Sequence, residues 1–193
     1  GLWSPLRHVR RRQARAGRPV ATRDRAIGVT SSSNVRRVGG CPRRPVAGGT
    51  DLVVGARQGK AALPEAIVAI DRIDTLGGIV EVDGGLRLGA LVTHDEIVAD
   101  RAIRERFTAL ADASAIVGSH ATRTHGTIGG NVMNASPAMD TGGPLLCFGA
   151  SANLRSASGE RALPLEQLWT GPGETAADPR ELLLDHGDDD AEH

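Results

Sequence analysis

The sequence of 193 residues predicts an α+β domain, and two kinds of local pattern lead to this prediction. Residues 79–88 and 152–165 alternate apolar and polar side chains around short turns, which is typical of β-hairpins. Residues 93–99 begin with a capping box, and residues 103–114 carry apolar side chains at helical spacing. Hairpins and short helices in one chain indicate an α+β fold.

A strand, a glycine turn and a helix follow one another at the start of the patterned region. Residues 45–47 predict a short buried strand, residues 48–50 (Gly-Gly-Thr) a turn, and residues 51–56 a helix. A helix that opens directly from a glycine turn presents free backbone amides, which is an anion-binding arrangement. Residues 67–70 predict the next strand.

Two helices are expected after the first hairpin. The first begins at Thr93, whose hydroxyl and the carboxylate of Glu96 each satisfy a backbone amide, and it continues to about Ala99. Apolar residues between 103 and 114 predict a second amphipathic helix that ends before Gly118. We expect its apolar stripe to lie in the core.

The remaining elements are short. Residues 145–150 predict a buried helix, residues 152–165 the second hairpin, and residues 166–169 a short helix. After Glu-Leu-Leu at residues 181–183 the sequence becomes acidic and loses its periodicity. We therefore expect residues 184–193 to form an acidic tail without regular structure.

Charge is distributed unevenly along the chain. Residues 1–44 contain twelve arginines and one acid, Asp24, which leaves 11 basic and 22 acidic residues in the rest. Because residues 1–44 show neither a helical nor a strand period, we expect a disordered or out-of-frame segment there. A nucleic-acid-binding arm and an organellar transit peptide are the alternatives. The expected folded domain is then 45–183.

Several classes of protein are excluded by what the sequence lacks. No stretch approaches the roughly 18 apolar residues of a membrane span, and no secretory signal is present, so we expect a cytoplasmic protein. Cys41 and Cys147 are too few and too far apart for a disulfide framework or a zinc site. Neither Lys60 nor the scattered histidines form a catalytic constellation, so redox chemistry would need a bound cofactor.

Two glycine turns are the features most suggestive of binding. Residues 47–51 and 127–131 each combine paired glycines with a threonine. Paired glycines let the backbone bend so that consecutive amides can surround phosphate oxygens. If both turns faced one ligand, they could clamp a pyrophosphate from two sides. The alternative is that both are simple turns, because a lone Gly-Gly is a weak motif.

Four blocks of sequence, in a fixed order, carry a resemblance to a known family. They are residues 46–52 (Val-Ala-Gly-Gly-Thr-Asp-Leu), 89–94 (Gly-Ala-Leu-Val-Thr-His), 126–131 (Gly-Thr-Ile-Gly-Gly-Asn) and 134–140 (Asn-Ala-Ser-Pro-Ala-Met-Asp). Together they resemble the FAD-binding medium subunit of molybdenum hydroxylases, the flavoprotein partner in complexes of the xanthine dehydrogenase and carbon monoxide dehydrogenase type.

The resemblance implies an FAD-binding fold of the PCMH type, made of two α/β lobes, with its C-terminal part truncated. The implied role of Asp140 is to contact the cofactor, and a carboxylate can accept hydrogen bonds from ribose or adenine donors. Leu183 resembles the position that packs near the isoalloxazine ring. The implied cofactor-binding residues are Val46, Ala47, Gly48, Gly49, Thr50, Asp51, Leu52, Thr127, Ile128, Gly129, Gly130, Asn131, Asp140 and Leu183.

The implied function is that of an oxidoreductase subunit that passes electrons from iron–sulfur clusters through FAD to NAD or another acceptor. The implied partners are a large subunit with the molybdenum cofactor and a small [2Fe-2S] subunit, without nucleic acid. Two alternatives remain open. One is another flavin oxidoreductase of the PCMH fold, such as a cell-wall precursor reductase. The other is a non-functional fragment with a shifted reading frame at one or both ends.

Overall fold

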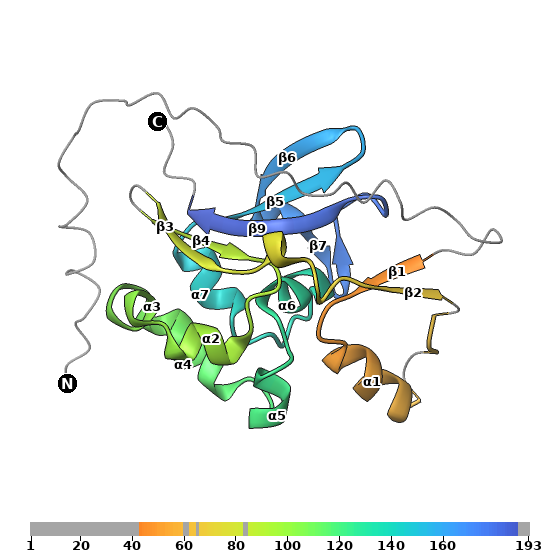
Figure 1. Cartoon of the computed structure of the whole chain (residues 1–193), viewed down its shortest axis with the longest axis horizontal. Helices are drawn as coiled ribbons and strands as arrows, with labels where there is room; N and C mark the ends of the chain where they lie inside the picture. The colour runs from red at the N-terminus through yellow and green to blue at the C-terminus, as the bar shows by residue number, and fades with distance from the viewer. Residues whose placement is uncertain (1–42, 60–61, 65, 83–84, 189–193) are drawn as a thin grey trace.

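The computed structural model describes residues 43–59, 62–64, 66–82 and 85–188 (Figure 1). Residues 1–42 lie outside these ranges, and with them almost all of the arginine-rich segment expected at 1–44. The last part of the expected acidic tail, residues 189–193, also lies outside them.

A small parallel unit opens the described part of the chain. Strand β1 (Arg43–Val46) pairs in parallel with β2 (Ala66–Ala69), and helix α1 (Thr50–Arg57) connects them. This confirms the expected order of strand, glycine turn and helix. The strand is not buried, however: Pro45 is exposed and Val46 is half-buried. Within the described residues β1 is paired along one side alone, by β2, so it gains little cover.

The main sheet has five strands, and every neighbouring pair in it is antiparallel. Both expected hairpins are confirmed and form its two edges, since Ile79 pairs with Leu88 in one and Ser156 with Gly159 in the other. The strands in their spatial order are β3 (Ile79–Val82), β4 (Gly85–Gly89), β9 (Leu182–Asp188), β5 (Ala150–Ser156) and β6 (Gly159–Pro164).

Strand β9 differs from the expectation for the end of the chain. Residues 184–188 were expected in an acidic tail, but they continue the strand that begins at Leu182 and lies between β4 and β5. Asp185 pairs with Gly89 on one side and with Asn153 on the other, and the Asn153 amide donates a hydrogen bond to its carboxylate. Backbone pairing on both sides, with strands distant in sequence, outweighs the absence of an alternating pattern.

Six helices lie on one side of this sheet (Figure 1). The expected capping box is confirmed, because the Glu96 N–H donates to Thr93 Oγ1 (3.2 Å) and the Thr93 N–H donates to the Glu96 carboxylate (2.7 Å). The six helices are α2 (His94–Ala99), α3 (Arg101–Arg106), α4 (Thr108–Ile116), α5 (His120–Arg123), α6 (Ile128–Asn134) and α7 (Gly142–Cys147).

No helix within the described ranges is long and apolar enough to cross a membrane.

Two expected helices have different bounds in the structure. The single helix expected over 103–114 is two helices, because Phe107 leaves helical geometry (φ −124°, ψ 42°) between α3 and α4. The Phe107 ring packs edge-on against Phe148, with centroids 5.1 Å apart. The helix expected over 145–150 ends at Cys147, because Gly149 takes a left-handed conformation (φ 71°) and strand β5 begins at the next residue.

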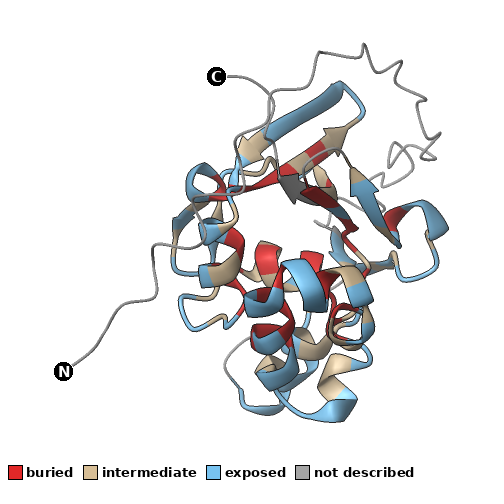
Figure 2. Cartoon of the chain, turned by 90° about the vertical axis from the view of Figure 1, so that its left-hand side faces the viewer, coloured by how far each residue is buried: buried red, intermediate tan, exposed pale blue. Residues whose placement is uncertain are grey.

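The hydrophobic core lies between the sheet and these helices (Figure 2). The apolar stripe expected between residues 103 and 114 is confirmed as part of it, since Ile103, Phe107 and Leu110 are buried. Leu154 of β5 and Ile128 and Val132 of α6 are fully buried in the same cluster. The core therefore fixes α6, which follows the second glycine turn, against the main sheet.

Four short elements complete the described chain. A helix over residues 166–169 was expected, and one is found a residue earlier. The Trp169 indole N–H donates to the carbonyl oxygen of Val132 in α6 (2.9 Å), which ties this region to the helical layer. The elements are the 3₁₀ helix η3 (Asp74–Leu76), α8 (Leu165–Leu168), β7 (Trp169–Gly171) and β8 (Glu174–Thr175).

The central position of β9 gives a testable prediction. A chain that stops after residue 181 lacks the strand between β4 and β5, together with the buried side chain of Leu183. Loss of one such leucine alone costs about 2–5 kcal/mol, which is a large part of the roughly 5–15 kcal/mol that stabilises a domain. We expect no cooperative urea unfolding for this chain, whereas a control that stops after residue 188 unfolds cooperatively. Cooperative unfolding of both chains at the same urea concentration would contradict this.

Candidate functional site

The first glycine turn connects β1 to α1 and leaves a run of backbone amides open. Gly49 is the N-terminal cap of α1 and takes a left-handed conformation (φ 66°), and its carbonyl oxygen accepts the N–H of Val53 (3.0 Å). The N–H groups of residues 50–52 belong to the first helical turn, where no carbonyl precedes them within the helix. Within the described residues, the N–H groups of residues 48–52 donate no hydrogen bond.

The second glycine turn, at the start of α6, uses its amides differently. The N–H groups of Ile128 and Gly129 donate to the carbonyl oxygens of Val92 (2.9 Å) and Ala90 (3.1 Å). The Gly130 N–H donates to Thr127 Oγ1 (3.1 Å). This turn is therefore fastened to the segment between β4 and α2, and its amides are already occupied.

Both turns require glycine because atoms of neighbouring segments lie where a Cβ would be. A Cβ added to Gly48 would overlap the carbonyl oxygen of His125, which lies two residues before Thr127. A Cβ added to Gly129 would lie 2.7 Å from the Cβ of Ala90. Real Cβ atoms do not come this close to other atoms. These glycines therefore let the first turn approach the second, and the second approach the segment that follows β4.

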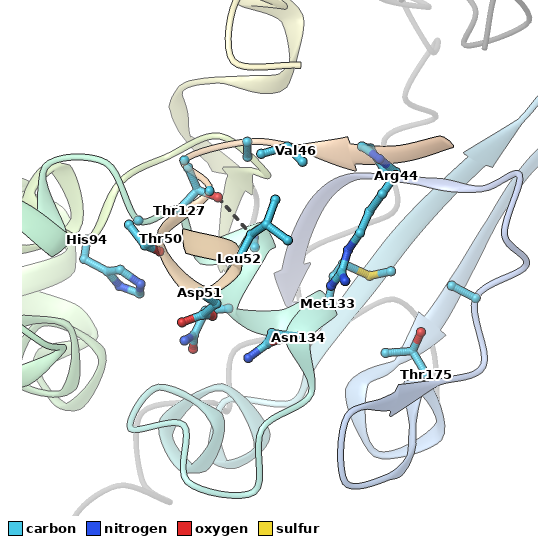
Figure 3. A pocket seen from close by; sticks show the side chains of 18 of the residues that line it. Arg44, Val46, Thr50, Asp51, Leu52, His94, Thr127, Met133, Asn134 and Thr175 are labelled. Carbon is cyan, nitrogen blue, oxygen red and sulfur yellow. Dashed lines mark hydrogen bonds between the residues drawn. The ribbon is translucent and has the colours of Figure 1, made fainter. Parts of the chain in front are cut away.

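The two turns face a common cleft with a volume of about 330 Å³ (Figure 3). This is near the lower end of the range of about 300–1,000 Å³ for small-molecule sites. Most residues of the two expected segments line it, so the structure brings together segments that are more than 70 residues apart in sequence. Those that line it are Val46, Ala47, Gly48, Gly49, Thr50, Asp51, Leu52, Thr127, Gly130 and Asn131.

Four expected residues do not line the cleft. Ile128 and Gly129 are buried beneath the second turn. Leu183 lies in β9 with its side chain 2% exposed, in the core. Asp140 is exposed in the loop before α7, close enough to His94 to affect its pKa.

The cleft also contains residues that were not expected. They are Arg44 of β1, His94 of α2, Met133 and Asn134 of α6, and residues between 175 and 181. Figure 3 shows Arg44 and Thr175 on the opposite side of the cleft from His94. The capping residue Thr93 predicts that His94 is the first residue of a helix. No local sequence pattern predicts that its side chain faces a cavity.

His94 is a buried, titratable residue of the cleft. Its side chain is 1% exposed, and this burial lowers its pKa below the ordinary value of 6.5. The carboxylates of Asp51, Asp95 and Asp140 oppose this shift, while the Arg123 guanidinium adds to it. Lowering the pKa favours the neutral imidazole.

The opposite rim of the cleft carries two carboxylates that are paired with arginines. Arg161 donates two hydrogen bonds to Glu181 (2.7 and 2.8 Å), and this lowers the pKa of the glutamate. Arg180 in the same way lowers the pKa of Asp178 to about 2. Both carboxylates are therefore ionised at neutral pH, with a positive charge beside each.

The geometry of the cleft suits an anionic, hydroxyl-bearing ligand. Open amides and the hydroxyls of Thr50 and Thr127 line it. Within the described residues, no group of three or more His, Cys, Asp or Glu side chains could hold a metal ion. These donors fit the phosphate groups of a dinucleotide cofactor.

Comparisons with known protein families and with individual proteins identify the same family. The family described as "FAD binding domain in molybdopterin dehydrogenase" matches residues 33–185. The xanthine dehydrogenase FAD-binding subunit of Escherichia coli O157:H7 is 29% identical over 140 residues, covering 72% of this chain and 48% of that one. The carbon monoxide dehydrogenase medium chain of Afipia carboxidovorans is 30% identical with the same coverage.

A solved structure of reconstituted CO dehydrogenase from Oligotropha carboxidovorans matches with a TM-score of 0.72 and 29% identity. The match covers 76% of this chain and 51% of that chain. It confirms the fold that the resemblance implies. The chain spans about half the length of the relatives it matches.

The contact between Gly48 and His125 gives a prediction for stability. Gly48→Ala places a Cβ on a backbone carbonyl, so one of the two turns must move, and we expect a loss of about 1–3 kcal/mol. Gly77→Ala is the control, because Gly77 is exposed, has φ −99°, and its added Cβ has only an ordinary contact at 3.5 Å. Urea unfolding of both variants measures the difference. Equal midpoints would show that the two turns are not held by this contact.

Proposed function

The chain belongs to the family of FAD-binding domains in molybdopterin dehydrogenases, and we propose that the cleft between its two glycine turns holds the pyrophosphate of FAD. The observation that carries this proposal is the run of open amides at residues 48–52, set against the second glycine turn. A pyrophosphate needs several donors that converge on a small volume, and this wall provides them from the backbone.

The first turn supplies the main phosphate contacts in this proposal. The amides of residues 48–52 precede and open α1, so their N–H groups can surround phosphate oxygens at the positive end of the helix. The Thr50 hydroxyl adds a donor, since it makes no hydrogen bond to the described part of the chain and lines the cleft. Gly48 and Gly49 carry no side chain that would keep a phosphate away from the backbone.

The second turn forms the other wall of the proposed site. Its amides are occupied, so it contributes through the Thr127 hydroxyl, the bare surface of Gly130 and the Asn131 side chain. The Asn131 Oδ1 accepts a hydrogen bond from the Thr141 hydroxyl (2.6 Å), which leaves its NH₂ group available to donate.

Two further expected residues stand differently in this proposal. Asp140 is retained as an acceptor for ribose or adenine donors, because it lies near the His94 end of the cleft. The Leu183 side chain is not part of the proposed site, since it is buried between the sheet and the helices. A contact of this residue with the isoalloxazine ring would require the flavin to enter the core.

We further propose that the chain serves as the flavoprotein part of a molybdenum hydroxylase complex. FAD accepts electrons from iron–sulfur clusters and passes them to NAD or another acceptor, so the chemistry belongs to the cofactor. The proposed partners are a large molybdenum-cofactor subunit and a small [2Fe-2S] subunit. The relatives named as FAD-binding or medium subunits of dehydrogenases support this. The residues described here would bind and orient the flavin.

A blocked cleft tests the cofactor proposal. Thr50→Trp places an indole in the first turn of α1, where it occupies the space proposed for the pyrophosphate. We expect FAD affinity, measured by quenching of flavin fluorescence, to fall by about tenfold or more, which corresponds to about 1.4 kcal/mol. Val53→Trp is the matched control, because Val53 lies on the same helix, is 46% exposed and does not line the cleft.

Three results would distinguish the alternatives. Tight FAD binding by the wild type and by Val53→Trp, with weak binding by Thr50→Trp, supports the proposed site. Equal binding by all three proteins would place FAD elsewhere. No FAD uptake by a folded wild-type chain would contradict the proposal and favour a non-functional fragment.

A further inference from the structure

We propose that His94 is a ligand-contacting residue of this cleft and that it forms a hydrogen bond with a sugar hydroxyl of the bound dinucleotide. This inference rests on the proposed function and adds to it a side chain outside the two glycine turns.

One nitrogen of the buried His94 imidazole has no hydrogen-bond partner within the described part of the chain. Its side chain is 1% exposed, and its Nδ1 atom is buried with no hydrogen-bond partner among the described residues. An unpaired buried polar group costs free energy, and such groups are rare in folded proteins. A ligand that pairs with the imidazole would remove this cost on binding.

The backbone holds the imidazole between the two glycine turns. The His94 N–H donates to the carbonyl oxygen of Gly126 (3.1 Å), and Thr93 forms a β-bridge with Thr127. A Cβ added to Gly126 would lie 3.5 Å from His94 Cδ2 and 3.6 Å from Thr50 Oγ1, so these three residues meet. Figure 3 shows the ring directed from α2 toward Thr50 and Asp51 of the first turn.

The protonation state of His94 suits a hydroxyl partner. Burial lowers its pKa, so the imidazole is neutral at neutral pH and has one N–H donor and one acceptor nitrogen. A hydroxyl group can both donate and accept, so it can pair with either nitrogen. A phosphate oxygen can only accept.

The charges that face His94 also favour a hydroxyl over a phosphate. The carboxylates of Asp51, Asp95 and Asp140 are the acidic groups near the ring. Among the described residues, the cation that acts on the ring is Arg123, and it is paired with Asp95 (Nε–Oδ1 3.3 Å). Because the carboxylates of Asp51 and Asp140 lie near the ring, a phosphate oxygen beside the imidazole would be repelled. The group that meets His94 therefore fits the ribityl chain or the ribose of FAD, which adjoin the pyrophosphate.

Two substitutions at His94 separate binding from packing. His94→Leu removes both nitrogens and keeps an apolar side chain, whereas His94→Asn retains an amide near the position of Nδ1. We expect His94→Leu to weaken FAD binding about five- to tenfold, as for the loss of one hydrogen bond, and His94→Asn to stay within about twofold of wild type. The apo stability of His94→Leu should be equal to or above that of wild type, since the unpaired nitrogen is gone.

The control is His120→Leu. His120 is an exposed histidine of α5 that pairs with Asp95 (3.2 Å) and does not line the cleft, so its loss should leave FAD affinity unchanged. Competition against FAD by FMN, ADP and inorganic pyrophosphate then identifies the contact. If FMN competes less well for the His94→Leu variant than for wild type, the contact is with a ribityl hydroxyl. If ADP competes less well, the contact is with the ribose.

Four outcomes would overturn this inference. One is FAD binding by His94→Leu within about twofold of wild type. Another is a joint loss of affinity and apo stability that His94→Asn does not restore, which indicates a packing role. If His94→Leu loses affinity for inorganic pyrophosphate but not for FMN or ADP, the contact is with a phosphate. If the wild-type chain binds no FAD, the proposed function fails and this inference fails with it, whereas unchanged binding by His94→Leu overturns only the inference.

Discussion

The close approach of Gly48 to the carbonyl oxygen of His125 is the contact on which the rest of the site depends. It holds the turn before α1 against the segment that leads into α6, although the two belong to different parts of the fold. Helix α6 is in turn fastened to the β4–α2 connection by the amides of Ile128 and Gly129. The core therefore positions the first turn indirectly, through the second turn, and any side chain at Gly48 would disturb the contact between them.

The two glycine turns have different roles although their sequences are similar. In the second turn the glycines serve packing, because Gly129 lies against Ala90 and its N–H is occupied. In the first turn the amides of residues 48–52 remain open. One turn thus acts as the wall that supports the other, and the phosphate-binding capacity lies mainly in the first. The buried His94 extends the cleft on the side away from Arg44.

Local signals predicted much of this fold, and long-range contacts account for the rest. Both hairpins and the capping box of Thr93 and Glu96 depend on neighbours in sequence, so they could be identified. Strand β9 could not, because its partners are β4 and β5, far away in the chain. The two turns were identified as a possible joint site, but the occupied amides of the second turn and the burial of His94 follow from packing that no local pattern encodes.

Hydrogen exchange of the backbone amides, followed with and without FAD, tests the division of roles between the turns most directly. We expect FAD to slow exchange strongly at residues 48–52, whose amides are open. Amides 128–130 should already exchange slowly without ligand and change little, because each has a partner in the protein. Strand β3, none of whose residues lines the cleft, serves as the internal reference. A larger change at 128–130 than at 48–52, or no change at either turn when FAD is bound, would contradict the account.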